Sequence, residues 1–275
     1  MPEDEGALVS AGMWDRLASA WDAHGDWHTE VTAELTRRMV DRLDPAPGQR
    51  IVEAACGPTA DGAREVVRRC PDARVTATDL SPEMLAAARR RGGDALDYRV
   101  LDVANPDLAD GEIDGWLARW VYMLLPDPAA AFAQARRVLG AGGRFVTAVF
   151  DEPSANPFFM MPAGVLIEAG KLQPPTPGEP SMFALADTAR TTQLLEAAGF
   201  EHVEHQSVDV PYAFADGHEL WRWVTEVAGP VSLTLAQLEA DEVATLRAEI
   251  ERRAAAFAVG EGYSLPGRAL VFAAS

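Results

Sequence analysis

Short apolar runs alternate with helix-type patterns through the first 150 residues of the chain. Strand-type runs occur at residues 51–55, 74–78, 96–100, from 113 and at 143–150, and helical spacing separates them at 61–70, 81–91 and 128–139. Runs of this length and composition are typical of strands that are buried on both faces of a sheet. Because strands that alternate with helices form a parallel sheet with right-handed crossovers, we expect an α/β protein.

The segments that flank this region have different patterns. Residues 12–44 have helical spacing that breaks near Gly25, which predicts two helices. Residues 151–186 are rich in proline, and only Pro162 to Lys171 has a helical pattern. After a further helix and strand, residues 221–262 predict a helical pair and residues 269–274 a final strand.

The stretch QRIVEAACGPTADG, residues 49–62, has the pattern of a strand, a turn and the start of a helix. Gly57 permits a backbone turn that would strain other residues. The helix that begins near Ala60 presents its free N–H groups to whatever fills the turn. We therefore expect a bound small molecule there, although similar turns occur in α/β proteins that hold no cofactor.

An acidic residue follows each of the next two strands. Asp79 comes 22 positions after Gly57, close to the roughly 20-residue interval at which a carboxylate ending the second strand reaches the ribose of a nucleoside. Asp102 follows the third strand, where the same topology places it beside the adenine. The alternatives are that Asp79 caps a turn and that Asp102 is an ordinary loop residue.

Composition and charge limit the partners of the protein. The 275 residues carry a formal net charge of −18 at pH 7, which opposes binding to nucleic acid or to anionic lipid. No apolar run approaches the roughly 20 residues that cross a bilayer, and residues 1–10 are acidic where a secretory signal is basic. We expect no membrane insertion and a cytoplasmic location, and leave the oligomeric state open, with a homodimer as one option. Cys56 and Cys70 alone provide neither a disulfide framework nor a metal cluster.

Aromatic side chains gather in the N-terminal segment and in the proline-rich segment. Trp14, Trp21 and Trp27, with His24 and His28 among them, form either a lid over a ligand or ordinary helix packing. In the second segment the run FFMM, residues 158–161, either lines an apolar acceptor pocket or packs within the segment.

Two further groups of side chains have simpler interpretations. Arg89, Arg90 and Arg91 end a helix, where cations complement the helix dipole, so we expect a solvated helix end. His202 and His205 have no third ligand nearby in the sequence and are expected to be surface residues of a strand.

With these residues in place, the chain from about Trp14 to its C-terminus resembles the class I S-adenosylmethionine-dependent methyltransferases. Within them it is most similar to the ubiquinone/menaquinone-biosynthesis C-methyltransferase-like group. The motifs that carry the resemblance are, in order, EAACGPTADG, TDLSPEML, LDVANPDL and ARWVYMLLPDPAAAFAQARRVLGAGGRF. The chain departs from the family pattern at Ala55 and Thr59, which stand where loop glycines are usual. Alanine is expected to be tolerated, whereas the branched Thr59 adds bulk beside the cofactor.

The resemblance implies a Rossmann-like, doubly wound α/β sheet of seven strands whose last strand is antiparallel. Together with the patterns along the chain, it gives the expected domains: a helical lid at residues 1–44, a cofactor-binding core at 45–150, an insertion over the active site at 151–186 and, at 187–275, completion of the sheet with an added helical segment. The insertion is expected there because it begins at the carboxyl end of the fifth strand. S-adenosylmethionine is the implied cofactor, with Gly57 near the methionine, Asp79 on the ribose and Asp102 near the adenine.

The predicted site contains more cofactor contacts than acceptor contacts. The cofactor contacts are Glu53, Ala55, Gly57, Asp79, Leu80, Met84, Asp102, Val103, Arg119 and Trp21. The acceptor contacts are Trp120, Tyr122, Phe158 and Phe159. No metal ligand and no catalytic residue is assigned, although His28 and Tyr122 have the chemistry of a general base.

The expected function is methyl transfer to a small, apolar or aromatic acceptor, such as a natural product or a quinone-like molecule. One alternative is an enzyme that keeps the cofactor but catalyses a different reaction, such as a cyclisation in natural-product biosynthesis. Another is a non-enzymatic module that binds S-adenosylmethionine. Asp79 and Asp102 argue against a lost cofactor site, while Thr59 and the lack of an obvious base leave the cyclase open.

Overall fold

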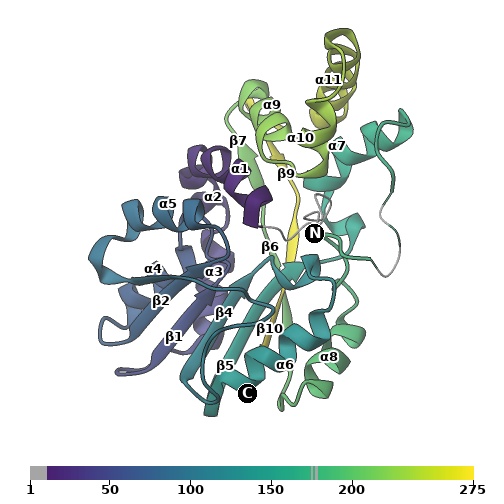
Figure 1. The fold of residues 1–275 in the computed structure, drawn as a ribbon. Helices are drawn as coiled ribbons and strands as arrows, with labels where there is room; N and C mark the ends of the chain where they lie inside the picture. The colour runs from purple at the N-terminus through teal and green to yellow at the C-terminus, as the bar shows by residue number, and fades with distance from the viewer. Residues whose placement is uncertain (1–10, 175, 177–178) are drawn as a thin grey trace. The chain divides into compact units, whose positions relative to one another are not determined.

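The computed structural model describes residues 11–174, 176 and 179–275, which form two compact units (Figure 1). Among these residues, the first unit takes 11–151, 179–208 and 269–275, and the second takes 152–174, 176 and 209–268. The acidic segment at residues 1–10 lies outside the described residues.

The first unit contains the seven-stranded sheet that the resemblance implied. Its strands are β1 (Arg50–Ala54), β2 (Arg74–Asp79), β3 (Asp97–Val100), β4 (Ile113–Arg119), β5 (Leu139–Phe150), β6 (Glu204–Asp209) and β10 (Arg268–Ala274). They lie in the order β3-β2-β1-β4-β5-β10-β6. Strands β1 to β5 pair in parallel and β10 pairs antiparallel to β5, so the α/β fold class and the antiparallel last strand are confirmed.

Helices cover this sheet, and the strand order dictates their faces. They are α1 (Ala11–Ala23), α2 (Gly25–Val31), α3 (Ala33–Leu43), α4 (Asp61–Arg69), α5 (Pro82–Gly92), α6 (Pro128–Val138) and α8 (Thr188–Ala197), with short 3-10 turns η1 (Gly93–Ala95) and η2 (Tyr122–Leu124). The chain moves outward from β1 in one direction to β3 and in the other to β5, so right-handed crossovers place α4 and α5 on one face and α6 on the other. The reversal between β1 and β4 is where open α/β sheets bind ligands, at the carboxyl ends of the strands.

Two local details explain where the helices start and stop. Ser81 caps α5, because its hydroxyl accepts a hydrogen bond from the N–H of Met84 at 3.1 Å. The prediction of two helices in residues 12–44 was wrong, because three form. The extra break falls at Thr32, whose N–H and hydroxyl both donate to the carbonyl of His28, at 3.1 and 2.7 Å, and a hydroxyl bond of this kind often bends a helix.

The second unit combines helices with a small antiparallel sheet. Its helices are α7 (Pro157–Glu168), α9 (Gly217–Glu226), α10 (Pro230–Leu235) and α11 (Ala240–Ala254), with turns η3 (Pro153–Ala155) and η4 (Ala255–Phe257). Its strands β7 (Tyr212–Phe214), β9 (Gly262–Leu265) and β8 (Ala258–Val259) pair in that order. Residues 221–262, which were predicted to form two helices, contribute to three, α9, α10 and α11. Gly229 and Pro230 separate α9 from α10. Among the described residues, no helix is both long and apolar enough to cross a membrane.

Candidate functional site

The turn after β1 has an unusual backbone. Three residues have positive φ angles: Ala55 at 52°, Gly57 at 60° and Ala60 at 44°. Gly57 adopts this conformation freely, whereas each alanine stores strain that a glycine would not. The N–H of Gly57 donates to Oδ2 of Asp79 at 2.9 Å, so the turn is joined directly to the end of β2.

Glu53 organises the start of α4. Its carboxylate is buried and accepts hydrogen bonds from the N–H groups of Gly62 at 3.0 Å and Ala63 at 2.8 Å. Burial raises the pKa of Glu53 to about 7, against the opposing effect of these two N–H donors. A side chain at position 62 would place its Cβ 2.6 Å from Oε1 of Glu53, so glycine is required there.

Asp79 and Asp102 stand at the ends of neighbouring strands. The buried Asp79 carboxylate accepts one hydrogen bond on each oxygen, from Gly57 and, at 3.0 Å, from Ser81. Burial raises its pKa and these N–H donors oppose that effect. Each oxygen keeps a second lone pair for a ligand. Asp102 is exposed and accepts from the N–H of Ala104 at 2.8 Å, which fixes the loop after β3.

Thr59 fits its position without backbone strain. It is not among the residues with positive φ, and its side chain is buried. A Cβ at Gly25 of α2 would lie 3.0 Å from Cγ2 of Thr59, so the absence of a side chain at Gly25 makes room for this methyl group. Of the two residues that depart from the family pattern, Ala55 therefore has a strained backbone and Thr59 does not.

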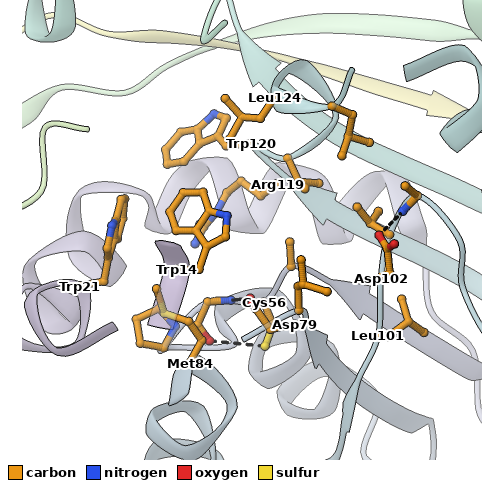
Figure 2. A pocket seen from close by; sticks show the side chains of 18 of the residues that line it. Trp14, Trp21, Cys56, Asp79, Met84, Leu101, Asp102, Arg119, Trp120 and Leu124 are labelled. Atoms are coloured by element: carbon orange, nitrogen blue, oxygen red, sulfur yellow. Dashed lines mark hydrogen bonds between the residues drawn. The ribbon is translucent and has the colours of Figure 1, made fainter. Parts of the chain in front are cut away.

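One cavity lies at the carboxyl ends of β1, β2 and β4, and only residues of the first unit line it (Figure 2). Its lining includes nine of the ten predicted cofactor contacts: Trp21, Ala55, Gly57, Asp79, Leu80, Met84, Asp102, Val103 and Arg119. In Figure 2 the indoles of Trp14, Trp21 and Trp120 lie on one side of the space, with Leu101 and Asp102 across from them. The cavity thus has an aromatic wall that faces the carboxylate of Asp102.

The remaining predicted site residues lie outside this lining. The Glu53 carboxylate instead accepts hydrogen bonds from N–H groups in the first turn of α4. Tyr122 is fully buried and stacks on Phe132 with ring centroids 4.5 Å apart. Phe158 and Phe159 belong to the second unit, where Phe158 stacks on Tyr212 at 3.5 Å. Among the four predicted acceptor contacts, Trp120 is the one that lines the cavity.

Several lining residues escaped the sequence prediction. Trp14, His28 and Thr59, which the sequence offered as a lid residue, a candidate base and a residue beside the cofactor, also line the cavity. The lining residues that the sequence did not indicate are Cys56, Pro58, Leu101, Ala104, Val121, Leu124, Leu125 and Pro126. The last four belong to the loop after β4, and the apolar run that ends in Pro126 was a usable signal. Burial raises the pKa of the Cys56 thiol well above its ordinary value, so this side chain stays protonated.

A buried polar cluster joins α2 and α3 to the end of β4. The Arg119 guanidinium donates to the hydroxyls of Thr32 and Thr36, both at 2.9 Å, and to Oδ2 of Asp61 at 2.8 Å. Asp61 also accepts from the hydroxyl of Thr29 at 2.7 Å. Although burial raises the pKa of Asp61, the Arg119 charge outweighs it and the pKa is lowered. The Arg119 guanidinium therefore directs its hydrogen bonds mainly to side chains of the protein and not into the cavity.

His28 lies beside this cluster and lines the cavity. Its Nδ1 is 4.0 Å from Oδ2 of Asp61. Burial, with a contribution from the Arg119 charge, lowers the pKa of His28 to about 3, against the opposing effect of Asp61. The imidazole is therefore neutral at physiological pH.

The expectation of a solvated helix end at Arg89 to Arg91 was wrong for Arg91, whose side chain is 22% exposed, whereas that of Arg90 is 63% exposed. Arg90 and Arg91 both form ion pairs with Asp22 of α1. Arg91 also donates to the carbonyl of Pro58 in the turn after β1, at 3.3 Å. These contacts connect α1, α5 and the turn.

The family described as "Methyltransferase domain" matches residues 52–147, which run from within β1 to within β5 and include most of the cavity lining. The chain therefore contains a methyltransferase domain. Nocamycin O-methyltransferase of Saccharothrix syringae is 27% identical to this methyltransferase over 90% of the chain and 91% of its own length. The ubiquinone/menaquinone biosynthesis C-methyltransferase of Caulobacter vibrioides is 32% identical over 53% of the chain, and the match spans 62% of that protein's length.

A solved structure shares the fold of this methyltransferase. The phosphoethanolamine N-methyltransferase 2 of Haemonchus contortus, in complex with phosphomonomethylethanolamine and S-adenosylhomocysteine, superposes with a TM-score of 0.58 at 16% identity. That similarity covers 97% of this chain and 60% of the other. The names of these three proteins describe an O-, a C- and an N-methyltransferase. Similarity to them therefore does not identify the atom that this chain would methylate.

Proposed function

We propose that this chain binds S-adenosylmethionine and transfers its methyl group to a small, uncharged, apolar or aromatic acceptor. One observation carries the proposal: a single cavity at the reversal of the strand order brings together the turn at Gly57, the carboxylate of Asp79 and the loop at Asp102. These are the groups that a nucleoside joined to an amino acid needs, in the order in which the chain presents them.

The residues of the cavity fit this cofactor. Asp79 keeps lone pairs free for the two ribose hydroxyls, and Gly57 leaves space because no atom lies within 4 Å of the place where a Cβ would stand. Bound S-adenosylmethionine supplies an electrophilic methyl group on a positively charged sulfur. The chain must then hold an acceptor in line with that methyl group and exclude water, and such positioning accounts for much of the rate in two-substrate reactions.

The electrostatics of the cavity support an uncharged acceptor. Among the described lining residues, Arg119 is the only lysine or arginine, and Asp61 already pairs with it. A phosphorylated acceptor would need several cations. The indoles of Trp14, Trp21 and Trp120 instead offer flat apolar surface.

Calorimetry with S-adenosylmethionine and S-adenosylhomocysteine tests the cofactor assignment. We expect Asp79→Ala to weaken binding about ten- to a hundredfold, the range for losing hydrogen bonds to a charged group, while the exposed Asp72→Ala leaves it unchanged. Equal affinity of wild type and Asp79→Ala would remove Asp79 from the site. Circular dichroism of each variant separates lost binding from lost folding.

The cyclase alternative has a separate readout. Labelled S-adenosylmethionine is incubated with uncharged aromatic and polyketide acceptors, and both methyl incorporation and acceptor isomerisation are measured. Conversion of an acceptor without consumption of the methyl group would favour a cyclase that retains the cofactor. Binding of the cofactor with neither reaction would favour a non-enzymatic module.

A further inference from the structure

Two ring nitrogens in the cavity lining have no hydrogen-bond partner among the described residues. They are Nε2 of His28 and Nε1 of Trp120, and both atoms are buried. Buried polar atoms in native proteins are nearly always paired, so each such atom calls for an explanation. The two rings contact each other edge to face, with centroids 5.5 Å apart.

The two nitrogens have opposite hydrogen-bonding character. An indole Nε1–H can only donate. Because Nδ1 of His28 faces the ionised Asp61 at 4.0 Å, we assign the proton of the neutral imidazole to Nδ1, which leaves Nε2 as an acceptor. The pair therefore offers one donor and one acceptor on two side chains that line the same cavity.

Both rings are held in place by the fold. Trp120 has a φ angle of 57°, a strained conformation for a bulky residue, and stacks on Phe150 with ring centroids 4.6 Å apart. Strain of this kind persists where the surrounding structure enforces it, and it concentrates at functional sites. His28 is fixed between Trp21 and Trp120, with 5.5 Å between ring centroids on each side.

We propose that the acceptor atom is a protic oxygen, a hydroxyl or enol, held between Nε1–H of Trp120 and Nε2 of His28. The inference rests on the proposed methyl transfer and names its acceptor class. A hydroxyl oxygen has two lone pairs and one proton: one lone pair accepts from Trp120, the other attacks the methyl group, and the proton points at His28. A neutral amine has a single lone pair and cannot do both, and a ring carbon has none.

The step balances in atoms and charge. The new bond joins the acceptor oxygen to the methyl carbon, and the carbon–sulfur pair of electrons returns to sulfur, which becomes a neutral thioether. The O–H proton passes to Nε2 of His28, whose imidazolium takes over the positive charge that sulfur loses. The carboxylate of Asp61, whose Oδ2 lies 4.0 Å from Nδ1, offsets part of that charge. His28 is thus assigned as the general base.

A binding comparison tests the acceptor class without turnover. In the presence of saturating S-adenosylhomocysteine, calorimetry measures the affinities of 2-naphthol and its methyl ether. The methyl ether can still accept from Trp120 but has no proton to donate to His28, so one neutral hydrogen bond predicts that the naphthol binds about 2- to 10-fold more tightly to the wild type. Trp120→Phe, which keeps an aromatic ring and removes the donor, should weaken the binding of both probes severalfold. No preference for the naphthol in the wild type, including failure of both probes to bind, overturns the proposal.

A turnover experiment tests the role of His28. A 1,4-naphthohydroquinone, kept reduced under anaerobic conditions, offers both O–H groups and unsubstituted ring carbons to labelled S-adenosylmethionine. We expect an O-methyl product, and a 10²- to 10⁴-fold lower kcat for His28→Gln with unchanged KM and S-adenosylhomocysteine affinity. His205→Gln, at an exposed residue of β6, is the matched control and should retain the wild-type kcat.

The outcomes separate the two proposals. If S-adenosylhomocysteine does not bind to the wild type, the proposed function fails. If it binds and the methyl group goes to a ring carbon, or His28→Gln keeps the wild-type kcat, only the hydroxyl acceptor and the base are overturned. The naphthol comparison decides the acceptor class where the hydroquinone is not turned over.

Discussion

Arg119 and Asp61 form an ion pair of 2.8 Å between side chains that are only 10% and 3% exposed. The two residues lie 58 positions apart, one ending β4 and the other starting α4. Thr29, Thr32 and Thr36 complete the hydrogen bonding from the N-terminal helices. The ion pair and these threonines therefore connect the N-terminal helices to the end of β4, where Arg119 lines the cavity.

Removing one partner of this pair should strongly destabilise the protein. Arg119→Met leaves the buried Asp61 carboxylate without its cation, a change that typically costs about 3–5 kcal/mol. Arg222→Met, which breaks an exposed pair with Glu226, should cost less than about 1 kcal/mol. Urea unfolding of both variants measures the difference. A loss below about 1 kcal/mol for Arg119→Met would show that water or a rearranged neighbour compensates Asp61.

Ala55 should be replaceable by glycine with a gain in stability. Its φ angle of 52° is unfavourable for a residue with a Cβ by roughly 1–2 kcal/mol, and part of that gain is offset by the greater freedom of glycine in the unfolded chain. We expect Ala55→Gly to raise the free energy of unfolding by up to about 1 kcal/mol. Ala54→Gly, one residue earlier in the buried strand β1, should lower it. A loss of stability in both variants would argue against stored strain at Ala55.

The pH dependence of stability should report the neutral state of His28. Its pKa in the folded protein is about 3, below the ordinary value of 6.5, so the unfolded chain binds a proton that the folded chain rejects. This contribution to stability is present above pH 6.5 and is lost as the pH falls toward 3, by about 1 kcal/mol per pH unit. His28→Gln should therefore flatten the loss of stability between pH 6.5 and 5 in urea unfolding. Parallel curves for wild type and variant would mean that His28 titrates normally.

Much of the fold could be predicted from the sequence because its signal is local. Apolar runs and helical spacing placed β1 to β5, and the spacing from Gly57 to Asp79 anticipated that both line one cavity. The hydrogen bond between these two residues explains why that spacing matters.

Other features depend on tertiary contacts that no local pattern reveals. Arg91 resembled a solvated helix end, yet it pairs with Asp22, 69 positions away. The strained backbone of Trp120 and the space that Gly25 leaves for Thr59 likewise depend on neighbours that are distant in the sequence. Phe158 had the composition of an acceptor contact, but its partners in the second unit, Tyr212 above all, are invisible from sequence.

The N-terminal helix α1 is held to the first unit mainly by polar contacts. Ala18 is its one buried residue among those described. Toward one end of α1, Asp15 accepts a hydrogen bond from Ser81, and toward the other Asp22 pairs with Arg90 and Arg91. A helix with little buried apolar surface opens locally at a low cost in free energy, so we expect these contacts to control local opening of α1.

Arg91→Met should therefore loosen α1 and weaken cofactor binding together. The guanidinium of Arg91 binds Asp22 and, at 3.3 Å, the carbonyl of Pro58, whose residue lines the cavity. We expect faster hydrogen exchange across residues 11–31 and roughly a three- to tenfold loss of S-adenosylhomocysteine affinity, the effect of about one hydrogen bond. Arg89→Met is the matched control, since Arg89 lies over the ring of Tyr98 and not on α1. In the wild type, S-adenosylhomocysteine should slow exchange in the same segment if it covers the ligand. Unchanged exchange in Arg91→Met, or equal exchange of wild type with and without ligand, would make α1 a fixed part of the scaffold.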